Sequence, residues 1–178
     1  MGSVCPLFIN SIQCETMKNL RYLKPEAVKL LVVHCSGNRC DHELTVEGLI
    51  ATGNARFGQP SYHYYVRRNG AVVPILPESV QGIHAKNYNH CSLGICYEGG
   101  LSAKGVAEDT RTEAQKHALY ALLKCLRADY PKARIVGHCE LPHVTKPCPC
   151  FPASGICRTA AEVRVGMPWC VAIRAGAV

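Results

Sequence analysis

Residues 27–34 read AVKLLVVH, an apolar and β-branched run that ends at the polar segment Ser36-Gly37-Asn38. A run of this kind, bounded by turn-forming residues, is typical of a buried strand that leads into a loop. The pattern therefore predicts a strand with His34 at its C-terminal end. Two further short apolar runs predict strands in the same way, at residues 93–97 and 134–137.

A hairpin and two helices are predicted between these strands. Asn69-Gly70 separates the runs 62–67 and 71–75, and this dipeptide favours the positive φ angles of a tight type I′ turn. Threonine N-caps precede apolar positions at helical spacing, which predicts helices over residues 45–55 and 112–130. In the longer helix a glutamine three residues after the threonine completes a capping-box pattern. No internal repeat or linker indicates a second domain.

The composition indicates a globular protein. The 178 residues are 48% hydrophobic and 19% charged. No uninterrupted apolar run approaches the roughly 18 residues that a membrane-spanning helix needs. The formal net charge of +7 favours an anionic partner. Aromatic and basic residues interleave from Tyr62 to Arg68, but strand alternation divides them between two faces, so nucleic acid is a poor candidate for that partner.

Twelve cysteines are spread along the chain. Their density is below the roughly 8–10% that is typical of short secreted disulfide scaffolds. The N-terminus also lacks a basic segment followed by an apolar one, the pattern of a secretory signal. We therefore expect synthesis in a reducing cytoplasm and mostly free thiols. Cys96 and Cys125 have apolar neighbours and are expected to act as small core side chains.

Two histidines and one cysteine are the residue types of a zinc site. His34 and His138 each follow a predicted strand, and Cys148 lies in a Lys-Pro-Cys-Pro-Cys loop. Catalytic zinc sites use three protein ligands and leave a fourth position for water. From the residues alone, Cys150 remains an alternative thiolate, and a histidine at a strand end is commonly a satisfied polar residue. The other candidate imidazoles are His42, His63, His84, His90, His117 and His143.

Five motifs in a fixed order carry a family resemblance. They are VVHCS, SYHYYVRRNG, GIHAKNYNHCSLGICYEGG, DTRTEAQKHALYALL and IVGHCELPHVTKPCPCF. In this order they resemble the zinc-dependent N-acetylmuramoyl-L-alanine amidases of the phage T7 lysozyme type, which are similar to peptidoglycan recognition proteins. The resemblance covers roughly residues 28–152. It implies a single α/β domain with a central mixed β-sheet flanked by helices, and a site at the strand ends.

The resemblance also implies roles for seven residues: zinc ligands His34, His138 and Cys148, catalytic groups Tyr62 and Lys146, and substrate-binding residues His84 and Asn89. Zinc makes bound water a better nucleophile and polarises a carbonyl group. The tyrosine phenol is expected to position water and to shuttle a proton, and the lysine ammonium to stabilise the oxyanion. The implied reaction is hydrolysis of the amide bond between N-acetylmuramic acid and L-alanine of the peptidoglycan stem peptide.

Two other functions are weighed against this one. A non-catalytic peptidoglycan-binding or regulatory module on the same fold is the main alternative, and the presence of Cys148 argues against it. A redox or structural zinc protein is a further alternative, but the chain has no Cys-x-x-Cys. We expect a catalytic domain over residues 25–157, an N-terminal extension over 1–24 and a C-terminal tail over 158–178. A monomer that acts on the cell wall, without a nucleic-acid or membrane partner, completes the prediction.

Overall fold

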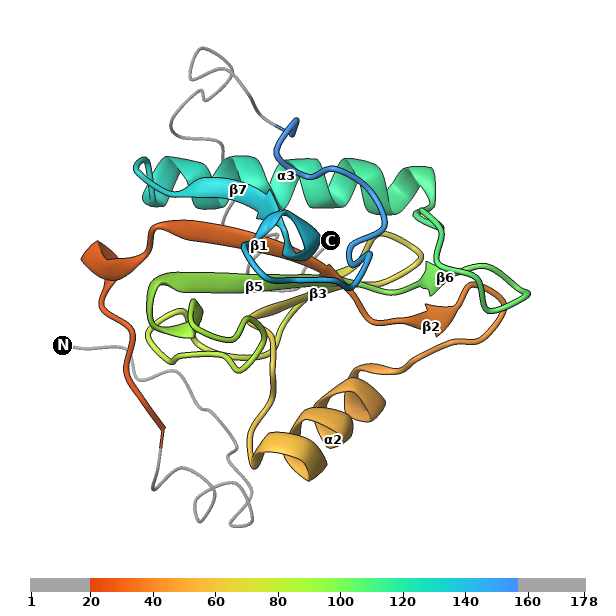
Figure 1. Ribbon diagram of the computed structural model, residues 1–178, viewed down its shortest axis with the longest axis horizontal. Helices are drawn as coiled ribbons and strands as arrows, with labels where there is room; N and C mark the ends of the chain where they lie inside the picture. The colour runs from red at the N-terminus through yellow and green to blue at the C-terminus, as the bar shows by residue number, and fades with distance from the viewer. Residues whose placement is uncertain (1–19, 157–178) are drawn as a thin grey trace, which may run out of the picture.

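A five-stranded mixed sheet lies at the centre of the computed structural model, which describes residues 20–156 (Figure 1). Its strands are β1 (Leu30–Cys35), β3 (Tyr64–Val66), β4 (Val72–Pro74), β5 (Ser92–Tyr97) and β7 (Arg134–Gly137). They lie in the order β4-β3-β5-β1-β7, with β4 antiparallel to β3 and the other neighbouring pairs parallel. The predicted central mixed sheet is therefore confirmed.

Two helices lie on opposite faces of the sheet, as Figure 1 shows. The leucines of α3 (Glu113–Asp129) share one buried core with alternate residues of β1 and β5. On the other face, Leu49 of α2 (Val46–Phe57) packs with Tyr65 and Cys96. The helices thus complete the layers of an α/β domain, as expected.

The alternation of β1 decides which way His34 points. Leu31 and Val33 pack into the core beneath α3, whereas Leu30 and Val32 belong to a second core on the opposite face. Successive side chains of a strand point to opposite faces, so His34 points away from α3. This places its imidazole on the face that carries α2 and the loops.

Hydrogen bonds fix the start of each predicted helix. Thr112 Oγ1 accepts from the Gln115 N–H at 3.1 Å, and Gln115 Oε1 accepts from the Thr112 N–H at 3.0 Å, so the predicted capping box is present. The buried Gln115 amide also donates to the carbonyl groups of Val66 and Glu98, which ties the helix to the sheet. The Thr45 side chain caps α2 in the same manner. The caps that the sequence predicts therefore determine where both helices begin.

The hairpin between β3 and β4 differs from the predicted turn. Only Gly70 of the Asn69-Gly70 pair has a positive φ, at 88°. The Gly70 N–H donates to the Arg67 carbonyl at 2.8 Å, and the Arg67 N–H donates to the Ala71 carbonyl at 2.8 Å. The loop therefore has three residues with glycine in the left-handed region, and the predicted type I′ turn is wrong. Asn69 instead accepts from the Ala71 N–H at 3.0 Å through its side chain, which stabilises the longer loop.

Several short elements have no counterpart in the prediction. They are η2 (Pro25–Ala27), β2 (Asn38–Arg39), η3 (Asn89–Cys91), β6 (Gly100–Leu101) and η4 (His138–Glu140). Strands β2 and β6 pair in parallel as a separate two-stranded sheet. Each element has only two or three residues, too few for a hydrophobic period to appear in the sequence.

The ends of the chain are only partly described. The predicted tail over 158–178 and residues 1–19 of the predicted extension lie outside the described residues. Leu23 is 3% exposed, and its N–H donates to the Ser79 carbonyl at 2.8 Å. The packed domain therefore already includes residue 23. Within residues 20–156, no helix is both long and apolar enough to cross a membrane.

Most of the described cysteines are free, as expected. The free thiols are those of Cys35, Cys40, Cys91, Cys96, Cys139, Cys148 and Cys150. Cys96 is a buried core residue, as predicted. Cys125 is buried in the core, as predicted, but it is disulfide-bonded and so is an exception to the mostly free thiols that we expected. Apolar neighbours predict burial but do not show whether a cysteine is paired.

Candidate metal centre and active site

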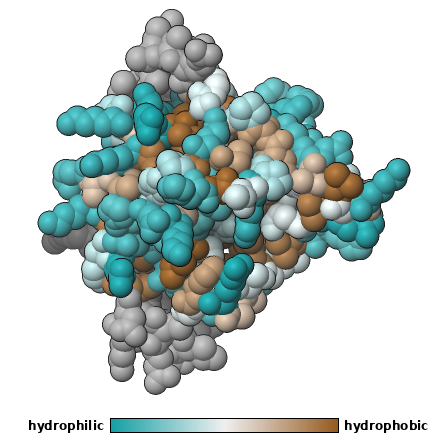
Figure 2. Space-filling model, viewed as in Figure 1, coloured by the Kyte–Doolittle hydropathy of each residue, from teal (hydrophilic) through white to brown (hydrophobic). Residues whose placement is uncertain are grey.

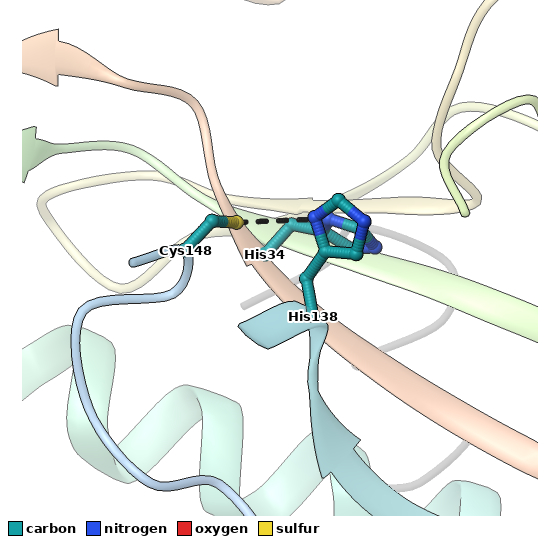
Figure 3. A group of neighbouring side chains, drawn as sticks. All are labelled: His34, His138 and Cys148. Atoms are coloured by element: carbon teal, nitrogen blue, oxygen red, sulfur yellow. Dashed lines mark hydrogen bonds between the residues drawn. The ribbon is translucent and has the colours of Figure 1, made fainter. Parts of the chain in front are cut away.

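His34, His138 and Cys148 meet at the C-terminal edge of the parallel strands. Their ligand atoms all lie within 4.8 Å of one another, and Figure 3 shows the side chains converging from three separate segments. β1 and β7 are parallel neighbours with Val33 opposite Gly137, so the next residues, His34 within β1 and His138 just after β7, lie at the same edge of the sheet. The two imidazole centroids are 4.6 Å apart. Strand register thus brings the two histidines of the predicted group together, and the loop after η4 brings the cysteine to them.

The backbone around Cys148 holds its sulfur towards His34. Cys148 Sγ lies 3.7 Å from His34 Nδ1 and accepts a hydrogen bond from the Cys35 N–H at 3.3 Å. The Cys148 carbonyl accepts from the Cys139 N–H at 2.6 Å. Cys150 Sγ instead donates to the Gly100 carbonyl at 3.2 Å, away from the two imidazoles. Of the two thiols that the sequence left open, the structure brings only Cys148 to the histidines.

Both histidines of the group favour the neutral form. Burial lowers the pKa of His34 well below its ordinary value, and His84 and His138 lower that pKa further. Burial also lowers the pKa of His138, with a contribution from the Lys146 ammonium. Neutral imidazole is the form that binds a metal ion. At neutral pH the group therefore offers two nitrogen donors and one sulfur donor.

We expect the metal-free protein to lose stability as the pH falls from about 7.5 to about 5.5. Burial lowers the folded-state pKa of His34, His63 and His84, whereas unfolded histidines titrate near about 6.5. Below that pH the unfolded chain binds more protons than the folded chain, so the free energy of unfolding decreases. Urea unfolding at three pH values across this range measures the effect. An unchanged free energy of unfolding would contradict the neutral, buried histidines.

Tyr62 and Lys146 both lie beside the three potential ligands, as the resemblance implies. The Tyr62 ring centroid is 5.1 Å from that of His34. Burial raises the pKa of Tyr62 well above its ordinary value, and nearby cysteines raise it further, so its phenol is protonated at neutral pH. Lys146 is exposed, on the same loop as Cys148. His63 follows Tyr62 but bonds to the Val80 carbonyl and the Gly94 N–H, away from the group.

His84 and Asn89 belong to the loop that covers His34. His84 Nδ1 lies 3.0 Å from His34 Nε2, and the two rings meet edge to face. Asn89 Oδ1 accepts from the N–H groups of His84 and Ala85, at 3.0 and 2.8 Å. Both residues therefore have structural contacts within the protein. They also line the cavity beside the three potential ligands, where the resemblance expects substrate.

A cavity of about 790 Å³ opens over this group. Three of its lining residues are cations: Arg56 of α2, Lys86 of the His84 loop, and Lys146. The face drawn in Figure 2 is largely hydrophilic, with apolar side chains in smaller patches between polar ones. The cavity thus combines a cluster of metal-binding residue types with a cationic lining that suits an anionic ligand.

Ser92 and Gly94 contact the His84 ring but were not predicted as site residues. Ser92 Oγ lies 3.3 Å from His84 Nε2, and Gly94 leaves the space that the His84 ring fills. A Cβ on Gly94 would lie only 2.6 Å from His84 Cγ. The only signal in the sequence is a glycine inside an apolar strand, which favours close approach of another group.

Comparison with known proteins identifies the family. Residues 24–151 match the family described as N-acetylmuramoyl-L-alanine amidase. The chain belongs to this family. The endolysins of Enterobacteria phage K11 and Escherichia phage T7 are each 32% identical to this amidase over 136 residues, covering 76% of the chain and 89% of each relative. The predicted resemblance to amidases of the T7 lysozyme type is confirmed.

Solved structures agree with this assignment of the amidase. The Ph2119 endolysin from Thermus scotoductus MAT2119 bacteriophage Ph2119 is 28% identical, with a TM-score of 0.59 over 74% of this chain and 80% of the other. Bumblebee PGRP-SA is 16% identical, with a TM-score of 0.63 over 82% of this chain and 88% of the other, and shows the shared fold alone. The amidase hydrolyses the amide bond between N-acetylmuramic acid and L-alanine in peptidoglycan. The predicted enzyme class is therefore confirmed.

Proposed function

We propose that this amidase depends on zinc, and that His34, His138 and Cys148 are the metal ligands. The observation that carries the proposal is the approach of all three ligand atoms to within 4.8 Å of one another. Two neutral imidazoles and a thiolate are a donor set that zinc prefers. Zinc bound by three protein ligands lowers the pKa of water to about 7 and polarises a carbonyl group.

Tyr62 supplies a protonated phenol at the edge of the site. Its ring is next to His34, and its raised pKa keeps the hydroxyl proton in place at neutral pH. A phenol in this state donates a hydrogen bond to an oxygen of the substrate or of the attacking water. It thereby orients that oxygen and provides a proton relay towards the departing amine.

Lys146 supplies a positive charge to the same cavity. Its ammonium is close enough to His138 to lower the pKa of that imidazole. The amide carbonyl oxygen gains negative charge as the bond is attacked, and a nearby ammonium lowers the energy of that charge. Because the Lys146 side chain is exposed, we expect bound substrate to hold the ammonium in place during the reaction.

The substrate side of the cavity is proposed to recognise the anionic stem peptide. Arg56 and Lys86 line it on α2 and on the His84 loop, and they attract carboxylates. His84 and Asn89 line the same cavity and are proposed to contact substrate there. The site therefore joins a proposed metal centre to a binding surface of matching charge.

Metal removal and reconstitution test the zinc proposal. We expect the chelator-treated protein to lose peptidoglycan hydrolysis and to recover it with one equivalent of Zn²⁺ but not with Mg²⁺. Released peptide and bound metal are measured on the same samples. Full activity in protein that is shown to be free of metal would contradict the proposal.

Substitution of Tyr62 and Lys146 tests their roles. We expect Tyr62→Phe and Lys146→Ala each to lower kcat by about 10²–10³-fold, because each removes a group that acts on the transition state. Lys86→Ala is the matched contrast from the same cavity, and it should raise KM with little change in kcat. Steady-state hydrolysis of a soluble muramyl peptide separates these effects. Unchanged kcat in Tyr62→Phe or Lys146→Ala would remove that residue from the mechanism.

We infer further that the enzyme acts on the cell wall as a monomer, without nucleic-acid or membrane partners. Its endolysin relatives and its peptidoglycan substrate support a wall location. The division of Tyr62 to Arg68 between strand faces argues against a nucleic-acid platform. Size-exclusion chromatography with light scattering tests the monomer, and a mass of two chains would contradict it.

A further inference from the structure

A chain of hydrogen bonds runs from the start of β5 to the proposed metal ligand His34. Ser92 Oγ is 3.3 Å from His84 Nε2, and His84 Nδ1 is 3.0 Å from His34 Nε2. His34 Nδ1, on the other side of that imidazole, lies 3.7 Å from Cys148 Sγ. The two nitrogens of His34 thus face different partners, one towards His84 and one towards the ligand group.

The hydrogen bond that the Ser92 hydroxyl donates determines which atom is the donor in each of the following hydrogen bonds. The Ser92 hydroxyl donates to the Tyr88 carbonyl at 2.8 Å, so its single proton is used there. Ser92 Oγ therefore accepts from His84 Nε2–H. A neutral imidazole has one protonated nitrogen, which leaves His84 Nδ1 as an acceptor for His34 Nε2–H. His34 Nδ1 is then unprotonated and directs its lone pair towards Cys148.

We propose that Ser92 and His84 are positioning residues that hold His34 in the tautomer whose Nδ1 binds the metal. The proposal rests on the proposed zinc function, because it concerns how a zinc ligand is oriented. A metal-binding histidine needs its other nitrogen to donate, and that outer hydrogen bond fixes both tautomer and ring orientation. Here the outer partner is itself a histidine, whose own tautomer is set by a serine.

The contacts around His84 hold its ring in place, so that Nδ1 continues to face His34 and Nε2 continues to face Ser92. Asn89 Oδ1 accepts from the His84 N–H and so clamps the backbone. The ring lies over Gly94, where a Cβ would come within 2.6 Å of His84 Cγ. The ring also meets the His63 ring edge to face, at a centroid distance of 6.0 Å. His63 is fixed in turn by the Gly94 N–H, at 2.9 Å. Gly94 thus leaves room for the His84 ring, and the residues around the ring keep it in place.

Paired substitutions at His84 separate hydrogen bonding from packing. Asn and Leu have similar size and shape, but only Asn offers an acceptor near the position of Nδ1. We expect His84→Leu to weaken Zn²⁺ affinity by about 10–100-fold, the usual effect of losing an outer-shell partner. His84→Asn should retain most of the wild-type affinity. Ser92→Ala, which frees His84 to adopt its other tautomer, should also weaken affinity.

Two readouts test the proposal. Competition with a chromophoric chelator gives the Zn²⁺ affinity, and thermal unfolding of the metal-free variants gives their stability. Long-range ¹H–¹⁵N correlation spectra of metal-free wild type report the His34 tautomer, which should be protonated at Nε2. Equal affinity losses in folded Asn and Leu variants, or His34 protonated at Nδ1 in wild type, would overturn the proposal.

The outcomes also distinguish this proposal from the zinc function on which it rests. If the wild-type chain binds no zinc, the proposed zinc function is wrong. The His34 tautomer measured in that metal-free chain still shows the direction of the hydrogen bonds. Zinc binding with His34 protonated at Nδ1 in the metal-free chain leaves the zinc function standing and removes the positioning role. If neither His84 variant folds, the wild-type tautomer and the Ser92→Ala affinity decide alone.

Discussion

Cys148→Ser is expected to reduce peptidoglycan hydrolysis by at least about a thousandfold and to remove tightly bound zinc. The substitution replaces the sulfur that groups with His34 and His138, the only one to do so within residues 20–156, with a hydroxyl, a poor zinc ligand at neutral pH. Two imidazoles alone do not form the three-ligand set of a catalytic zinc site. Released peptide and zinc per chain measure the two effects together.

Cys150→Ser is the matched control for this prediction. Cys150 is two residues further along the same loop, but its Sγ donates to the Gly100 carbonyl and lies outside the ligand group. We expect this variant to keep its zinc and most of its activity. Loss of zinc in Cys150→Ser with retention in Cys148→Ser would reverse the assignment of the thiolate.

Glu98→Ala is expected to lower the free energy of unfolding by about 3–5 kcal/mol, the usual cost of breaking a buried charged pair. The Glu98 carboxylate is 1% exposed and accepts from Arg67 Nε at 2.9 Å. It also accepts from the backbone N–H groups of Leu44 and Arg68, at 3.0 and 3.1 Å. Its removal takes the side-chain acceptor away from the N–H groups of Leu44 and Arg68 and leaves Arg67 paired only with the exposed Glu43 among the described residues. Urea unfolding at neutral pH measures the loss.

Glu43→Ala is the control that separates the effect of losing a buried carboxylate from the effect of losing a charge that pairs with Arg67. Glu43 also pairs with the Arg67 guanidinium, but its side chain is 66% exposed. Exposed ion pairs contribute about 0–1 kcal/mol, so we expect a change no larger than that. Equal destabilisation by the two substitutions would show that the pairing charge, rather than the buried backbone acceptor, stabilises this part of the fold.

Local sequence patterns predicted the main strands and helices, because apolar runs, helix caps and turn residues act between residues close together in the chain. The apolar run before His34, the capping box at Thr112 and the turn residue Gly70 each correspond to an element in the structure. The exact turn was not predictable, because the side chain of Asn69 bonds to the Ala71 N–H and so favours a longer loop. Turn type depends on such competing bonds as well as on the dipeptide.

The site was predictable only in part, because its contacts join distant segments. Strand ends indicated His34 and His138, and the family resemblance indicated Cys148. The choice between Cys148 and Cys150 depends on where the loop backbone is held, which spacing does not show. The contact between His84 and His34 spans 50 residues and depends on the register of β1 and β5. A hydrogen bond between a loop and a strand so far apart in the chain has no signature in one sequence.

The most direct test of the account is a crystal structure of the zinc-loaded enzyme, with anomalous diffraction data collected on both sides of the zinc absorption edge. We predict one strong anomalous peak within bonding distance of His34 Nδ1, an imidazole nitrogen of His138 and Cys148 Sγ. A zinc peak elsewhere on the chain, with these three side chains unliganded in an active enzyme, would contradict the account.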